Sequence, residues 1–222
     1  MTQSQWTAVD DYLTDLLFPA DEALDRALED ATSGGLPPIN VTAAQGKLLH
    51  ILAKAQGART ILEVGTLGGF STIWLARALP DDGRLVTLEI DPHHAEVAQA
   101  NIDRAGLADK VDIRVGPGIE TLPKLAAEGF GPIYFAFIDA DKPSNADYFE
   151  WALKLARVGT TIVVDNVIRD GHVVEADSDD PAVQGVRRFN DLLAAEKRVT
   201  ATEIQTVGSK GYDGFAIALV TG

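Results

Sequence analysis

Cysteine is absent from this sequence, methionine occurs once, and there is no long hydrophobic run. Without cysteine the chain has neither a disulfide framework nor a cysteine-ligated metal site. Any bound metal would depend on oxygen ligands or on one of four histidines. No apolar run approaches the roughly 18 residues of a membrane span, and the start, MTQSQWTAVDDYL, does not resemble a secretory signal. We therefore expect a cytoplasmic protein that does not enter a membrane.

Positive charge is also scarce. The chain has 19 Lys and Arg residues against 33 Asp and Glu residues, which gives a formal net charge of −14. A strong negative charge opposes binding to nucleic acid and to anionic lipid. The 222 residues, 46% of them hydrophobic, fit one globular domain. The simplest interpretation of the charge is that it keeps the protein soluble.

The first part of the chain is expected to be helical. Apolar residues from Trp6 to Leu17 repeat at helical spacing, and a second helical segment ends at SGGLPP. A third helix is expected after Thr42, with Gln45 three positions on completing a capping box. We expect one domain over residues 1–222, in which 1–40 form a helical appendage or oligomer arm and 41–222 form the core.

From Arg59 onward, short apolar runs alternate with helical stretches. Five strand-like runs, TILEV, RLVTLEI, KVDIRV, IYFAFI and TIVVD, are separated by helices that are expected to end at Gly106, Gly129 and Gly159. Two further runs, VTATEIQTV and GFAIALV, predict an antiparallel hairpin. The pattern predicts an α/β fold: a Rossmann-like, doubly wound, mostly parallel seven-stranded sheet with a C-terminal antiparallel hairpin and N-terminal helices.

In such a sheet, ligands bind beyond the carboxyl ends of the strands. The first strand is followed by a glycine-rich turn, EVGTLGGFS, in which Gly65 allows close backbone approach to a ligand. The second strand ends in Glu89, placed to hold ribose hydroxyls. Asp91 before Pro92 is better explained as a helix cap. Together the turn and Glu89 favour an adenosine-containing cofactor.

Two minor features adjoin these motifs. His93 and His94, in the first turn of the following helix, are most simply surface residues. The segment Gly116 to Gly118 follows the third strand, where backbone could support a base, although by itself it indicates only a turn.

The last two strands of the alternation end in polar residues. Asp139, Asp141 and Lys142 follow the fourth strand, and Asp165 and Asn166 follow the fifth. If these strands are neighbours, two carboxylates and an amide oxygen converge, since strands lie about 4.8 Å apart. Such oxygen donors suit Mg²⁺, or a relative such as Mn²⁺ or Ca²⁺. Each aspartate alone is as easily a helix cap or a solvated group, so the prediction rests on the set.

The stretches ILEVGTLGGFSTIWLARALP, FIDADK and VVDNV resemble those of the cation-dependent O-methyltransferases of the caffeoyl-CoA and catechol type. The resemblance extends from about Val41 to the C-terminus, and FIDADK with the later DN is its specific part. It implies S-adenosyl-L-methionine as methyl donor, an essential divalent cation, a phenolic small-molecule acceptor and a homodimer.

The resemblance also implies roles for individual residues. The implied cofactor contacts are Val41, Glu63, Gly65, Thr66, Ser71, Glu89, Gly118, Asp139 and Asp141. The implied metal ligands are Asp139, Asp165 and Asn166, and Lys142 falls on the lysine proposed as general base.

The chain departs from plant members after Asn166, where Arg169 and Asp170 stand in place of an aromatic residue and an amide. The loop 171–181 is expected to be a lid over the acceptor. Two alternatives remain at this point: a nicotinamide-dependent dehydrogenase, and a catalytically silent binding protein. The dehydrogenase explains Glu89 and the glycines but not the set of Asp139, Asp165 and Asn166.

Overall fold

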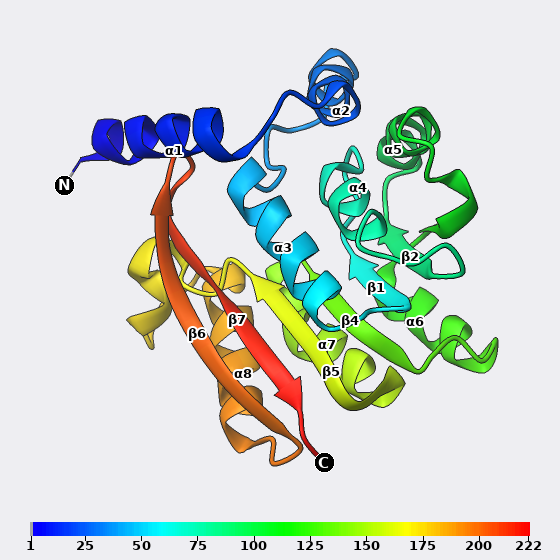
Figure 1. Cartoon of the computed structure of the whole chain (residues 1–222). Coiled ribbons are helices and arrows are strands. Elements are labelled where there is room, and N and C mark those ends of the chain that lie inside the picture. The colour runs from blue at the N-terminus through cyan, green and yellow to red at the C-terminus, as the bar shows by residue number, and fades with distance from the viewer. Residues whose placement is uncertain (1) are drawn as a thin grey trace.

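A seven-stranded sheet in the order β3-β2-β1-β4-β5-β7-β6 forms the centre of the computed structural model, which describes residues 2–222. The strands are β1 Thr60–Val64, β2 Arg84–Glu89, β3 Val111–Val115, β4 Ile133–Ile138, β5 Ala156–Asp165, β6 Val199–Gly208 and β7 Gly211–Val220. The first five are parallel, and β7 is antiparallel to both β5 and β6. The predicted fold class and hairpin are confirmed (Figure 1).

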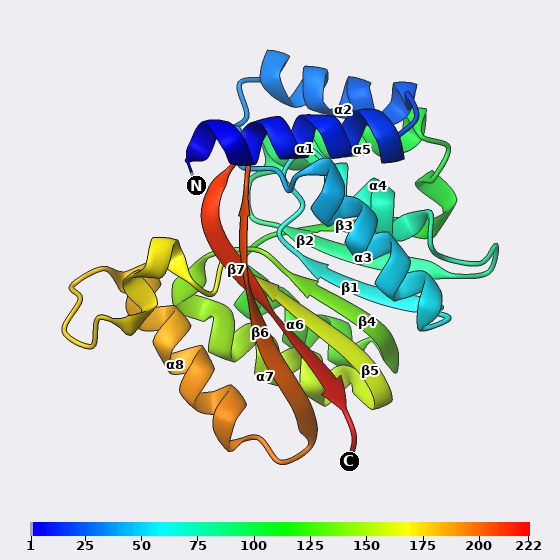
Figure 2. The same cartoon turned by 60° about the vertical axis from the view of Figure 1, so that its left-hand side comes forward.

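Helices cover both faces of this sheet (Figures 1 and 2). They are α1 Gln3–Leu17, α2 Glu22–Ser33, α3 Ala43–Ala55, α4 Phe70–Ala76, α5 Pro92–Arg104, α6 Gly118–Ala127, α7 Asn145–Leu155 and α8 Pro181–Ala195. Short 3₁₀ turns lie at η1 Ala108–Lys110, η2 Lys142–Ser144 and η3 Arg169–Val174. None of the helices among residues 2–222 is both long and apolar enough to span a bilayer.

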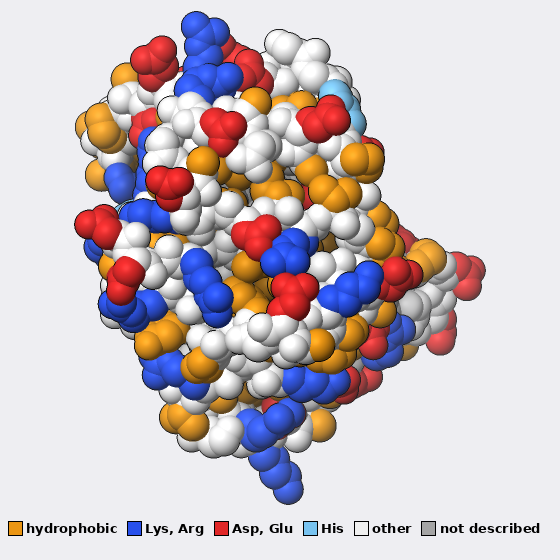
Figure 3. Space-filling model, turned by 90° about the vertical axis from the view of Figure 1, so that its right-hand side faces the viewer, with side chains coloured by type: hydrophobic (Ala, Val, Ile, Leu, Met, Phe, Trp, Pro, Cys, Tyr) orange, Lys and Arg blue, Asp and Glu red, His pale blue; other side chains and the backbone are white. Residues whose placement is uncertain are grey.

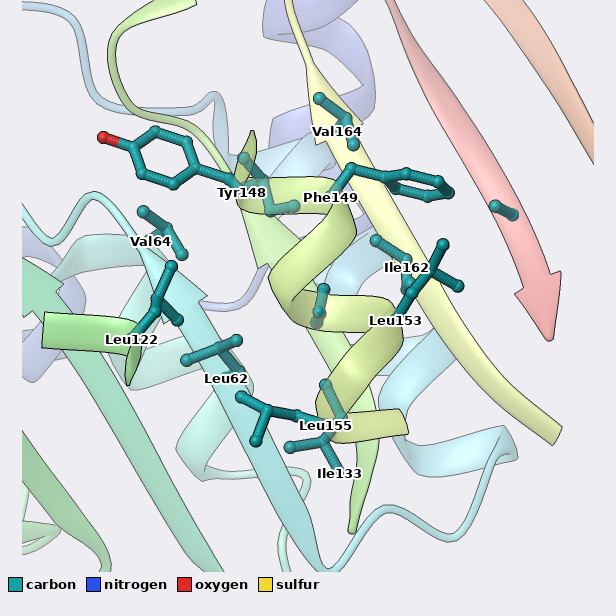
Figure 4. Close-up of a cluster of buried hydrophobic side chains, with 14 of the residues drawn as sticks. Leu62, Val64, Leu122, Ile133, Tyr148, Phe149, Leu153, Leu155, Ile162 and Val164 are labelled. Carbon is teal, nitrogen blue, oxygen red and sulfur yellow. The ribbon is translucent and has the colours of Figure 1, made fainter. Parts of the chain in front are cut away.

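Strand side chains alternate between two hydrophobic clusters, one on each face of the sheet. Leu62 and Val64 of β1 belong to the cluster under α6, α7 and α8, whereas Ile61 belongs to the cluster under α3, α4 and α5. In β4, Ile138 and Phe137 divide between the clusters in the same way. A parallel sheet buried on both faces needs apolar residues at successive positions, which is why these strands read as continuous apolar runs. Figure 4 shows part of the first cluster.

One predicted boundary is wrong. The helix expected to end at Gly159 ends at Leu155, and residues 156–159 begin β5. Ala156 pairs with Ile133 of β4, and the Thr160 hydroxyl donates to the Ile133 carbonyl at 2.6 Å. Sheet pairing therefore overrides the helical spacing of this segment.

The N-terminal segment divides into two parts. Within α1, which the structure describes completely, no residue is buried, whereas α2 buries Leu24 and Ala27 against the core. α1 lies across the tip of the β6–β7 hairpin (Figure 2). There Gln3 Nε2 donates to the Gly208 carbonyl at 2.9 Å, and Ser209 N donates to Asp10 Oδ2 at 2.7 Å. Polar contacts thus tie the first helix to the tip of the hairpin formed by the last two strands.

The negative net charge does not gather on the face drawn in Figure 3. Acidic, basic and hydrophobic side chains are interspersed on that face. It therefore presents no broad patch of one sign.

Candidate functional site

One register of the sheet brings the predicted site residues together. Val64 pairs with Leu88 on one side and Ile138 on the other, and Ile138 pairs with Val164. The next residue of each strand is Gly65, Glu89, Asp139 or Asp165. We call Val64, Leu88, Ile138 and Val164 the paired row. Backbone hydrogen bonds continue one residue beyond it, from Gly65 N to the Leu88 carbonyl at 2.9 Å and from Asp139 N to the Val64 carbonyl at 2.8 Å. β4 and β5 are neighbours, as the metal prediction required.

A cavity of about 750 Å³ opens at this edge. Its lining includes most of the predicted site: Val41, Gly65, Thr66, Ser71, Glu89, Gly118, Asp139, Asp141, Lys142 and Asn166. Glu63 and Asp165 are not part of the lining. Both are buried directly behind it, with Asp165 5% exposed and Glu63 fully enclosed. The sequence motifs thus meet at one cavity.

Gly65 is required by close packing between β1 and β4. Its φ is +100°, and a Cβ there would lie 2.8 Å from the Asp139 carbonyl carbon. Neither the backbone conformation nor the space admits a side chain. The glycine therefore lets the ends of the two central strands approach each other.

Glu63 supports the glycine turn from below. Its carboxylate accepts hydrogen bonds from Ser71 Oγ at 2.7 Å and Thr72 Oγ1 at 2.5 Å. Burial raises the pKa of Glu63 to about 7, although the two hydroxyl donors oppose this rise. Its link to the cavity is through Ser71, at the start of α4.

Glu89 has a structural role that the sequence did not reveal. Its Oε2 accepts from Thr66 N at 3.2 Å and Leu67 N at 2.7 Å, and its Oε1 accepts from Asp91 N at 3.0 Å. These bonds hold the turn in place, including Leu67 in the left-handed region at φ 50°.

Next to Glu89, the histidine pair is only partly as expected. His93 is exposed, but placing His94 at the surface was wrong: it lines the cavity, and its Nδ1 lies 3.5 Å from Glu89 Oε1. Asp91 does cap α5, by accepting from His93 N at 2.8 Å.

Tyr148 is a cavity residue that the sequence analysis missed. Its hydroxyl donates to Asp141 Oδ1 at 2.6 Å, and Ser144 Oγ donates to Asp141 Oδ2 at 2.5 Å. Burial and the bond to Asp141 raise the pKa of Tyr148. Its ring stands at the edge of the apolar cluster with the hydroxyl pointing away (Figure 4). A Cβ on Gly118 would lie 2.9 Å from this ring, so Gly118 leaves room for the tyrosine.

The two acidic strand ends have different partners. Asp139 Oδ1 accepts from Lys142 Nζ at 2.7 Å. Asp165 Oδ2 accepts from Gln45 Nε2 at 2.7 Å, and its Oδ1 accepts from Asn166 N at 2.9 Å. Burial, and then the charge of Asp139, raises the pKa of Asp165. Two carboxylates therefore lie close together, and Lys142 is paired with one of them.

Gln45 was assigned a different role by its sequence position. Thr42 Oγ1 accepts from Gln45 N at 3.2 Å, so half of the predicted capping box forms. The Gln45 side chain does not return to Thr42 but reaches Asp165. A capping box relates residues three positions apart, so it could not predict the contact from Gln45 to Asp165 at the end of β5.

The donor set fits a hard divalent cation. Asp139 and Asp165 supply carboxylate oxygens, and Asn166, in the left-handed region at φ 57°, supplies an amide that lines the cavity. A cation would relieve the repulsion between the two carboxylates. Among residues 2–222 no cluster of three or more acidic, histidine or cysteine side chains is placed to bind a metal. A cation here would therefore have two carboxylates and one amide available from the protein, with other oxygens to complete its shell.

The segment after Asn166 is fixed by Asp213 of β7. Asp213 Oδ1 accepts from Ile168 N at 3.0 Å, Arg169 N at 3.1 Å and Gly214 N at 2.9 Å. Arg169 and Asp170 have φ values of 54° and 56°. Arg169 lines the cavity, so a strained but well-held turn forms part of its wall.

Comparison with known proteins gives one consistent family. A model of the O-methyltransferase family matches residues 20–218. The catechol O-methyltransferase of Niastella koreensis is 55% identical over 220 residues, which cover 99% of this chain and 100% of that protein. Two solved structures are similar over nearly the whole chain. The O-methyltransferase from Bacillus cereus in complex with SAH has a TM-score of 0.98 and 53% identity, with 99% of this chain and 100% of that chain covered. TomG from Streptomyces achromogenes, an O-methyltransferase involved in tomaymycin synthesis and solved with SAM, has a TM-score of 0.97 and 52% identity, with both chains fully covered.

Proposed function

This chain belongs to the O-methyltransferase family, and we propose that it transfers a methyl group from S-adenosyl-L-methionine to a catechol-like or other vicinal-dihydroxy phenolic small molecule with the help of a divalent cation. The observation that carries the proposal is the convergence of Asp139, Asp165 and Asn166 beside Lys142 at the cavity. The family assignment decides against the dehydrogenase.

The cofactor assignment is supported by the chemistry of the cavity wall. Gly65, Thr66 and Ser71 come from the turn and the first residues of α4, Glu89 ends β2, and Gly118 is the first residue of α6. Val41 and Asp141 complete the proposed contacts, with Glu63 acting through Ser71. The SAH and SAM complexes of the two similar structures agree with this cofactor.

Asp139, Asp165 and Asn166 would hold the cation, which we propose to be Mg²⁺, or alternatively Mn²⁺ or Ca²⁺. When bound, such an ion stabilises a phenolate, which is scarce at neutral pH because a phenol has a pKa near 10. The vicinal hydroxyl of a catechol adds a second oxygen donor. This chelation is why the proposal favours vicinal-dihydroxy acceptors.

Lys142 is the side chain we propose as proton acceptor. It lies in the cavity lining, and its ion pair with Asp139 fixes the amine beside the proposed metal ligands. The ammonium form must lose a proton before it can act as a base. Methyl transfer itself then depends mainly on the in-line placement of oxygen and methyl group.

Homodimer formation stays a prediction. Exposed apolar residues on α1 (Val9, Tyr12, Leu13, Leu16 and Leu17) supply a surface that a second copy could cover. Light scattering during size-exclusion chromatography of the wild type and of Leu16→Glu tests this point.

The proposed function is tested by mass spectrometry of methyl transfer from S-adenosyl-L-methionine to a panel of catechols, monophenols and hydroxycinnamoyl thioesters, each with Mg²⁺ and with EDTA. We expect methylated catechols with Mg²⁺ and loss of product with EDTA. Full turnover in EDTA would rule out the cation dependence. Cofactor binding without turnover on any acceptor would support the catalytically silent alternative.

A further inference from the structure

The charged side chains of the cavity lining are almost all engaged with close partners. Lys142 and Asp139 pair with each other at 2.7 Å. Asp141 accepts from two hydroxyls, and Glu89 accepts from three backbone amides with His94 at 3.5 Å. These groups are therefore committed to the architecture of the site.

Arg169 is the exception. Within residues 2–222 its guanidinium donates no hydrogen bond, and its Nε is buried without a partner. The Arg169 Nη1 lies 3.9 Å from Asp213 Oδ2, a separation too long for a hydrogen bond. The Arg169 side chain is 31% exposed, so its outer nitrogens can reach water, but its Nε is buried. A buried donor without a partner is costly unless a ligand supplies an acceptor.

Hydrogen bonds to Asp213 hold the backbone at Arg169 in an uncommon conformation. A non-glycine residue at φ 54° is uncommon and needs support from its surroundings. Asp213 gives that support by accepting from the backbone nitrogens of Ile168 and Arg169. Asp213 therefore anchors the turn through Oδ1, while its Oδ2, at 3.9 Å from Arg169 Nη1, leaves the hydrogen-bond donors of the guanidinium free for another acceptor.

We propose that Arg169 recognises a carboxylate on the methyl acceptor, so that the preferred substrates are anionic vicinal-dihydroxyphenyl acids. This inference rests on the proposed function, because it concerns the same cavity. A guanidinium binds a carboxylate through two parallel N–H···O bonds, which gives both strength and orientation. Arg169 stands three positions after Asn166, so one short segment carries a proposed metal ligand and the proposed carboxylate contact.

A matched pair of acceptors isolates this contact. 3,4-Dihydroxybenzoate and 3,4-dihydroxybenzamide share the ring and both hydroxyls, and they differ in charge. The corresponding dihydroxycinnamate and its amide extend the spacing between ring and carboxylate. We expect the wild type to show a higher kcat/KM for the acid than for the amide in at least one pair.

The variants are Arg169→Met, Arg169→Lys and the control Arg157→Met. Arg157 also has a buried Nε without a partner among residues 2–222, but it lies at the opposite end of β5 from the cavity. Arg169→Met should lower the acid-to-amide ratio of kcat/KM on the order of 10-fold to 100-fold, as expected for a charged hydrogen-bonded pair. Arg169→Lys should fall between wild type and Arg169→Met, and Arg157→Met should keep the wild-type ratio.

A second readout does not depend on turnover. Isothermal titration of 3,4-dihydroxybenzoate into protein loaded with S-adenosylhomocysteine and Mg²⁺ should show weaker binding in both Arg169 variants, and circular dichroism should confirm their folding. If Arg169→Met does not fold, the decision falls to Arg169→Lys. In Arg169→Lys the acid-to-amide ratio of kcat/KM and the affinity for 3,4-dihydroxybenzoate should both fall, because a lysine amine cannot form the two parallel N–H···O bonds of a guanidinium.

The outcomes are distinguishable. An acid-to-amide ratio in the Arg169 variants within twofold of wild type overturns the carboxylate proposal and leaves the proposed function standing if catechols are still methylated. A wild type that prefers the amide in both pairs also overturns it. If wild type methylates none of the four acceptors or any other catechol, the proposed function fails and the inference fails with it.

Discussion

Gln45 and Asp165, 120 positions apart in the chain, are joined by a hydrogen bond of 2.7 Å from the glutamine amide nitrogen to Asp165 Oδ2. The bond connects the first turn of α3 to the end of β5. Together with the bond from Asn166 N to Oδ1, it restricts rotation of the carboxylate. Ligands held by such outer contacts bind metal more tightly because their orientation is already set.

We therefore predict that Gln45→Leu weakens divalent cation binding by about 10-fold to 100-fold. Electron paramagnetic resonance of free Mn²⁺ during titration measures this affinity without turnover. The matched control is Gln56→Leu. Gln56 caps the other end of α3 and accepts from Thr161 Oγ1 at 3.2 Å, so it also links α3 to β5 but is remote from the site. Equal affinities in the two variants would contradict a positioning role for Gln45.

Asp165→Asn should abolish cation-dependent methylation while leaving the fold intact. The substitution keeps the size of the side chain and removes a buried negative charge. Burial already disfavours that charge, since it raises the pKa of Asp165. Gln45 can turn its amide so that its oxygen accepts from the new NH₂ group. In differential scanning fluorimetry we expect the Mg²⁺-induced increase in melting temperature to disappear, and the cation-free protein to melt no lower than wild type. A retained Mg²⁺ response would show that Asp165 is not a ligand.

Glu63→Gln should stabilise the cation-free and cofactor-free protein, and the gain should grow with pH. Burial raises the pKa of Glu63 to about 7 in the fold, against an ordinary value of 4.5, so the folded state binds the proton more tightly than the unfolded state. Wild type therefore loses stability as pH rises from 4.5 to 7, and the loss stays constant above that range. The variant should gain up to about 3 kcal/mol at pH 8 and little at pH 4.5.

Urea denaturation at a series of pH values measures this difference. Glu150→Gln, at an exposed position of α7, controls for the chemical change. A gain for Glu63→Gln that does not vary between pH 5 and pH 8 would be inconsistent with the raised pKa.

Gly118→Ala should weaken cofactor binding by displacing Tyr148. The new Cβ would lie 2.9 Å from the Tyr148 ring, and overpacking of this kind costs about 1–3 kcal/mol. We expect the affinity for S-adenosylhomocysteine, measured by calorimetry, to fall by about 5-fold to 100-fold. Tyr148→Phe, which keeps the ring but removes the bond to Asp141, separates the steric effect from the hydrogen bond. Unchanged affinity in Gly118→Ala would place the cofactor away from this wall.

The sheet and most of the site could be predicted because each depends on local patterns. Apolar runs identify the strands, and the residue after each run is at the carboxyl end of a parallel sheet, so the sequence alone placed Glu89, Asp139 and Asp165 at this edge. The helix boundary at Gly159 failed because pairing with β4 extends β5 backward along the chain.

The remaining site residues depend on contacts that no local pattern contains. Gln45 reaches Asp165 from another element, and Tyr148 of α7 packs against Gly118 at the start of α6. Asp213 acts on a turn 44 and 45 positions before it. The roles of Gln45, Tyr148 and Asp213 can be recognised only in the folded structure, because their partners are distant in sequence.

The paired row Val64, Leu88, Ile138 and Val164 has a consequence for how this chain can vary. The residues that follow the row depend on strand register, and a deletion of one residue within β4 would draw Asp139 back by roughly 3.3 Å and reverse the face on which its side chain projects. A change in the length of a loop on the opposite edge alters none of these positions. Natural and engineered variants should therefore tolerate insertions between a helix and the next strand, but not between the first residue of a central strand and the end of the row.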